Sequence, residues 1–156
     1  MNKNLNNFTV YRTFEGTIIE LTCAVLFILS LACSILLLDQ NAGMAKGMLV
    51  STVICGISTL LGLVLTYAPH TFNIPDDSPE ELYWHVIRFI RIVAVLTALL
   101  QFGLSFSALL GVHPLPVLVA YVLAFIVLLV WYAVRKSRIT KQKSSSDETQ
   151  RDTKRL

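Results

Sequence analysis

Three long stretches of this chain contain no Asp, Glu, Lys or Arg, and they constrain its fold more than any other feature. The stretches cover residues 21–38, 47–75 and 92–134. A helix that crosses the hydrocarbon core of a bilayer needs about 20 apolar residues, so the stretches hold four such helices once turn residues divide them. Charged residues are 15% of the chain, against about 25% in ordinary globular domains. Because the deficit is confined to these runs, it indicates a membrane protein and not a very apolar soluble core.

Turn and capping residues divide the chain into one transmembrane domain with two polar flanks. We expect helices at about 17–38, 45–68, 79–112 and 116–134, within a domain that covers 17–134. Ser78 and Glu81 form a capping box at the start of the third helix, and Pro79 suits its first helical position. Residues 79–91 are too polar for hydrocarbon and should lie at the interface. We interpret 1–16 as a polar cytoplasmic segment and 135–156 as a disordered basic and polar cytoplasmic tail.

The Lys and Arg residues predict the orientation of this all-α bundle. If both termini lie on one side, that side carries twelve of the 13 basic residues and the opposite side carries Lys46 alone. Positive residues stay on the cytoplasmic side, so we expect both termini inside, in a bacterial cytoplasmic (inner) membrane. The basic cluster at 135–143 should attract anionic lipids.

Small residues recur at every fourth position in two of the expected helices. They are Gly43, Gly47, Ser51 and Cys55 in the second helix, and Gly103, Ser107 and Gly111 in the third. Such stripes let helix backbones approach closely in lipid. We interpret them as packing surfaces within the bundle, and the alternative is the face of a homodimer.

Two polar residues interrupt the apolar helices. Glu20 lies about one turn inside the first helix, where a carboxylate is costly unless it is paired or near the interface. Arg88 and Arg91 should lie at the same membrane level, so we predict an ion pair between Glu20 and one of them. Gln101 lies among apolar neighbours in the middle of a helix. A single amide in this position favours an interhelical hydrogen bond over a role as a substrate ligand.

The connection between the second and third helices is the richest polar segment. Our candidate cytoplasmic interaction site consists of Pro69, His70, Phe72, Asn73, Glu80, Tyr83, Arg88 and Arg91. His70, His85 and nearby carboxylates could hold a divalent metal, but no ligand spacing such as His-Glu-x-x-His occurs. A capped, salt-bridged helix start is the more economical interpretation. The sequence also shows no catalytic triad, phosphate-binding glycine loop or nucleic-acid motif, so we predict no catalytic residues, metal, cofactor or nucleic-acid partner.

The same connection carries a family resemblance. Residues 67–75 read Tyr-Ala-Pro-His-Thr-Phe-Asn-Ile-Pro, and Glu80, Tyr83, Arg88 and Arg91 follow. This pattern, over about residues 16–112, resembles DUF1648, a bacterial family of small multipass membrane proteins. The proline-rich loop typical of that family between the first two helices is reduced here to 39–46, so the chain resembles a degenerate member. The resemblance implies a link to the membrane part of a toxin-immunity and signalling protein.

These features leave three hypotheses about function. The favoured one is a non-enzymatic binding, regulatory or immunity-like component that contacts another membrane or cytoplasmic protein. The second is a subunit of a transporter or channel, which would require polar groups buried in the membrane and a helix broken at mid-depth. The third is a membrane enzyme that uses His70 and His85.

Overall fold

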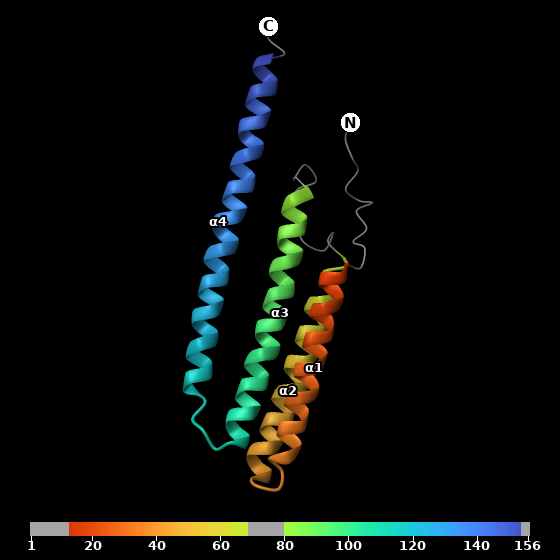
Figure 1. Ribbon diagram of the computed structural model, residues 1–156, viewed down its shortest axis with the longest axis vertical. Coiled ribbons are helices and arrows are strands. Elements are labelled where there is room, and N and C mark those ends of the chain that lie inside the picture. The colour runs from red at the N-terminus through yellow and green to blue at the C-terminus, as the bar shows by residue number, and fades with distance from the viewer. Residues whose placement is uncertain (1–12, 69–79, 154–156) are drawn as a thin grey trace.

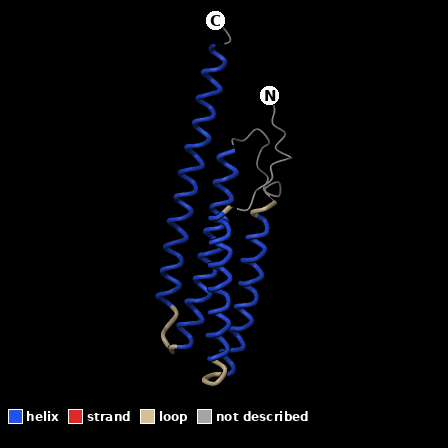
Figure 2. The backbone as a smooth tube through the Cα atoms, turned by 45° about the vertical axis from the view of Figure 1, so that its right-hand side comes forward, coloured by secondary structure: helices blue, strands red, loops and turns tan. Residues whose placement is uncertain are grey.

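The computed structural model is a bundle of four sequential helices, and it describes residues 13–68 and 80–153. The helices are α1 (Phe14–Leu36), α2 (Ala42–Leu65), α3 (Glu80–Leu109) and α4 (Leu115–Thr153). The expected capping residues Ser78 and Pro79 lie outside the described residues. Successive helices run in opposite directions, so the start of α1 and the end of α4 lie at the same end of the bundle (Figure 1). Figure 2 shows no strand in the part of the chain that the structure describes.

All four helices are long and apolar enough to cross a membrane, which confirms the predicted all-α, four-span class. Their outward surfaces are strongly apolar: Leu21, Val50, Leu60 and Val127 are each at least 60% exposed. A soluble monomer rarely exposes apolar patches of this extent. The same surface is favourable in hydrocarbon, so the exposure supports a multipass membrane protein.

Local capping residues define where the helices begin and end. The Thr13 hydroxyl accepts a hydrogen bond from the backbone N–H of Gly16 at the start of α1. The Asn41 side chain accepts from the N–H of Met44 at the start of α2. These contacts satisfy N–H groups that have no partner inside the helix. Beyond α3, Gly111 adopts φ +66°, the left-handed conformation that glycine tolerates best.

The packing surface of α2 lies beside the predicted small-residue stripe. Ala45 and Thr52 are fully buried, and Met48 packs against the cluster of Leu37, Ala45 and Ala108. At Gly47, by contrast, an added Cβ atom would have no neighbour within 4 Å. The face that packs against this cluster therefore follows positions 45, 48 and 52. Of the predicted stripe, Gly47 lies off this contact, whereas Ser51 hydrogen-bonds Gln101 of α3.

In α3, Gly103 lies at the contact with α4. A Cβ atom on Gly103 would stand 2.8 Å from Cγ1 of Val117, so only a residue without a side chain lets the two helices approach this closely. Helix α3 is central, because it contacts α1, α2 and α4, whereas α4 packs chiefly against α3.

The expected end of the fourth helix at 134 and the disordered tail over 135–156 are wrong for the described residues, because α4 continues to Thr153. No Gly or Pro occurs between 117 and 153, and Lys, Arg, Gln and Glu are good helix formers. The membrane span also supplies the costly helix nucleus, from which further turns propagate. The 39 residues of α4 extend about 58 Å, well beyond a hydrocarbon core of about 30 Å.

Candidate functional site

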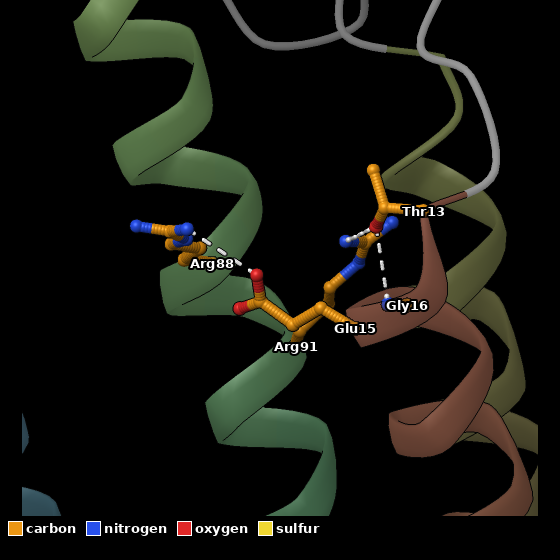
Figure 3. Close-up of polar contacts among 5 residues, drawn as sticks. All are labelled: Thr13, Glu15, Gly16, Arg88 and Arg91. Atoms are coloured by element: carbon orange, nitrogen blue, oxygen red, sulfur yellow. Dashed lines mark hydrogen bonds and ion pairs between the residues drawn. The ribbon is translucent and has the colours of Figure 1, made fainter.

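Arg91 joins α3 to the first turn of α1. Its side chain is 2% exposed, and its Nη1 donates a hydrogen bond of 3.2 Å to the Thr13 hydroxyl. That hydroxyl also accepts the Gly16 N–H at 3.1 Å, as Figure 3 shows. A Cβ on Gly16 would stand 2.7 Å from Arg91 Nη2. The missing side chain of Gly16 is therefore what allows the guanidinium to reach the cap.

The positive charge of Arg91 is buried in a partly unfavourable environment. The guanidinium lies beside the positive end of α1, and its buried Nη2 has no hydrogen-bond partner among the described residues. The Arg91 Cζ lies 5.8 Å from the centre of the Tyr67 ring, an attractive cation–π arrangement. The Tyr67 hydroxyl in turn donates to the Glu20 carboxylate. Tyr67 thus lies between the buried guanidinium of Arg91 and the carboxylate of Glu20.

The predicted ion pair between Glu20 and an arginine differs from the contacts that the structure shows. Arg88 pairs with Glu15 at 3.3 Å, whereas Glu20 hydrogen-bonds Tyr67. Glu15 lies in the first turn of α1, at the level of Arg88 (Figure 3). Glu20 is five residues further on, about 7.5 Å deeper. Both partners of the observed pair are about half exposed, so the pair adds little stability.

His85 attaches α4 to α3. The ring is 4% exposed, stacks on Tyr132 with 5.0 Å between centroids and lies 4.8 Å from Trp131. Its Nε2 lies 3.3 Å from the backbone carbonyl of Tyr132, so a protonated Nε2 donates to that oxygen. Phe89 extends the cluster, with its ring 4.3 Å from Tyr132. No sequence pattern indicates that His85 contacts the aromatic end of α4.

Gln101 forms the interhelical hydrogen bonds that its sequence context predicts. Its Oε1 accepts from the Ser51 hydroxyl at 3.0 Å, and its Nε2 donates to the Thr52 hydroxyl at 2.8 Å. A longer contact of 3.4 Å joins Nε2 to the Ser105 hydroxyl. The amide is 4% exposed, and these partners satisfy it on both sides.

A cavity of about 710 Å³ lies between α1 and α2. Glu20 and Tyr67 line the end nearest the start of α1, and apolar side chains of the two helices form the walls. Ala98 and Gln101 of α3 also line it. No residue pattern in the sequence predicts this cavity, because it depends on how α1 and α2 pack against each other.

The predicted interaction site is only partly described. Pro69, His70, Phe72 and Asn73 lie outside the described residues, as does the side chain of Glu80. The remaining three residues differ in exposure: Tyr83 is 5% and Arg91 2% exposed, whereas the side chain of Arg88 is 52% exposed. Of these three, Arg88 is therefore the one that a partner could contact directly.

The polar groups form no metal centre in the described part of the chain. No group of three or more His, Cys, Asp or Glu residues is placed there to hold a metal ion. No family model, curated protein or solved structure matches the chain. The resemblance to DUF1648 therefore stays a prediction from the sequence.

Proposed function

We propose that this protein is a non-catalytic binding or regulatory component of a bacterial cytoplasmic membrane, with an immunity-like role as one form of that function. In this proposal both termini are cytoplasmic, as the distribution of Lys and Arg favours. The protein acts by contacting a second protein at that end of the bundle. At that end, α4 is the described helix that extends well past its apolar span.

The observation that carries the proposal is the extension of α4. The apolar span of this helix ends at Ile139, and the helix continues over 140–153, about 21 Å further. Figure 1 shows this part standing clear of the other three helices. Although its residues favour a helix, most helical stability in proteins comes from packing against other elements. A partner that packs along it would stabilise it.

The packing of His85 supports a non-catalytic role for the polar end. A general acid or base must reach the proton that it transfers. His85 is instead enclosed by Trp131 and Tyr132, where it holds α4 against α3. The transporter alternative gains one observation, the cavity between α1 and α2, but the described helices are continuous through the bundle.

Photo-crosslinking from two positions on α4 tests the proposal. A benzophenone amino acid at Arg138, which is exposed, stands just before the extension, and one at Val119, which is 50% exposed, lies on the apolar span. We expect a discrete protein adduct from position 138 and lipid adducts alone from 119. The adduct from 138 should disappear when the chain is truncated after Ile139. Identical adducts at both positions, or an adduct that survives truncation, would contradict the proposal.

A further inference from the structure

The cavity between α1 and α2 has the dimensions of a ligand site in one leaflet of the membrane. Its volume of about 710 Å³ lies within the range of small-molecule pockets, about 300–1,000 Å³. Along α1 its lining runs from Glu20 to Ser30, about 15 Å. That length is half of a hydrocarbon core of about 30 Å. The cavity therefore extends from the membrane surface to the bilayer centre.

The cavity opens sideways to the surface that faces lipid. Val53, Leu60 and Val64 line it, and they are 47%, 61% and 56% exposed on the outside of the bundle. A ligand dissolved in the bilayer could enter between α1 and α2 without passing through the polar end. The lining thus favours a ligand with a large apolar body.

One charged group meets such a ligand. Of the described residues that line the cavity, Glu20 is the one with a formal charge at neutral pH. It is half-buried at the end nearest the membrane surface. A carboxylate offers about four lone-pair positions, so the hydrogen bond from the Tyr67 hydroxyl does not by itself prevent the charge of Glu20 from attracting a cation.

The aromatic lining adds a second attraction for positive charge. Phe27 and Tyr67 both line the cavity, and aromatic faces attract cations, especially where water is excluded. Arg91 contacts the Tyr67 ring but is not part of the cavity lining. Its charge opposes a second cation, so the ligand must gain most of its binding from apolar contact and from Glu20.

We propose that this cavity binds a lipophilic cation, an organic ammonium or phosphonium compound with an apolar body. The positive centre lies near the Glu20 carboxylate and the Tyr67 ring. The apolar body lies between α1 and α2, against Phe27. This site is separate from the proposed protein contact on α4, so either assignment can fail without the other.

Two probe ions of the same shape and opposite charge test the proposal. Tetraphenylphosphonium and tetraphenylborate differ in the sign of their charge, and binding of each to purified protein in phosphatidylcholine nanodiscs can be measured by equilibrium dialysis. Empty nanodiscs report partition into lipid. We expect saturable binding of one tetraphenylphosphonium per chain, and no saturable binding of tetraphenylborate.

Two substitutions and two matched controls locate the binding site. Glu20→Gln removes the charge, and we expect binding weaker by about tenfold or more, because close charge pairs contribute on this scale. Ala24→Phe fills the cavity from an exposed position on its wall and should abolish binding. The controls are Glu15→Gln, an acid on the same helix outside the cavity lining, and Ala120→Phe, an exposed alanine on α4. Both should bind as the unchanged protein does.

A thermal measurement guards against variants that fail to fold. A ligand that binds only the folded chain raises its melting temperature, so tetraphenylphosphonium should stabilise the unchanged protein and tetraphenylborate should not. Equal binding of the two ions, unaltered affinity in Glu20→Gln, or no saturable binding by the unchanged protein would each overturn the proposal.

Discussion

Replacing Gly16 by alanine should separate α1 from the guanidinium of Arg91. The new Cβ would stand 2.7 Å from Nη2, 2.9 Å from Cζ and 3.1 Å from Nη1 of Arg91. These distances are too short for the present arrangement. Because Arg91 is 2% exposed, the guanidinium has little free space and must give up its contacts with Thr13 and Tyr67.

The expected cost follows from those two contacts. A hydrogen bond to a charged group contributes about 1.5–3 kcal/mol, and the cation–π contact adds about 0.5–1 kcal/mol. Alanine gains about 1 kcal/mol over glycine inside a helix. We therefore expect Gly16→Ala to lower the free energy of unfolding by about 1–3 kcal/mol.

Denaturant unfolding in detergent micelles, followed by circular dichroism, measures this change. Gly47→Ala and Gly62→Ala are matched controls, because nothing lies within 4 Å of a Cβ at either position, and both should be neutral or stabilising. In an Arg91→Met background the cost of Gly16→Ala should shrink or change sign, since the contacts it disrupts are gone. An equal cost in both backgrounds, or a Gly16→Ala protein as stable as the two controls, would refute this reasoning.

Three further predictions concern the other polar contacts. Gln101→Leu leaves the hydroxyls of Thr52 and Ser51 without their partner and should lower the free energy of unfolding by about 0.6–1.7 kcal/mol, whereas a loss near zero would show that the network adds no stability. His85→Phe keeps the stacked ring and His85→Ala does not, so a cross-link between cysteines placed on α3 and α4 should form normally in the first and poorly in the second; equal cross-linking would contradict the role of the ring. Glu15→Gln should change stability by less than about 1 kcal/mol, and by still less at high salt, which a large, salt-independent loss in the same unfolding assay would disprove.

The membrane class is predictable because charge is absent from whole segments. No packing knowledge is needed to see that 92–134 cannot be a soluble surface, and the caps at Thr13 and Asn41 lie within a few residues of the expected helix starts. The helix ends are less predictable. The expected end at 134 follows from the loss of apolar residues, but polarity alone does not stop a helix that contains no Gly or Pro.

The partners of the polar residues are less predictable from the sequence than the helices are. Shared membrane level favours Glu20 as the partner of Arg88 or Arg91. The structure instead places Arg88 at the level of Glu15, which depends on how α1 and α3 are positioned against each other, and the role of Gly16 depends on where Arg91 lies. Neither is encoded in spacing within a single helix. Gln101 is predictable as a hydrogen-bonding residue because an amide in an apolar environment must find a partner, although its particular partners are not.

The attachment of α4 has a mechanical consequence. This helix has no glycine or proline after Pro116 and packs chiefly against α3, at Val117 near one end of its span and at Tyr132 near the other. Beyond its first turn, helix α4 therefore has no glycine or proline at which it would bend, and α3 is its main support. Any change that loosens the contact between His85 and α4 would tilt α4 as a rigid body about its contact with Gly103. The end of α4 near Thr153 would then move farthest. Motion along α4 would then couple the membrane interior to the end of the bundle where α1 begins and α4 ends, without any rearrangement of α1 or α2.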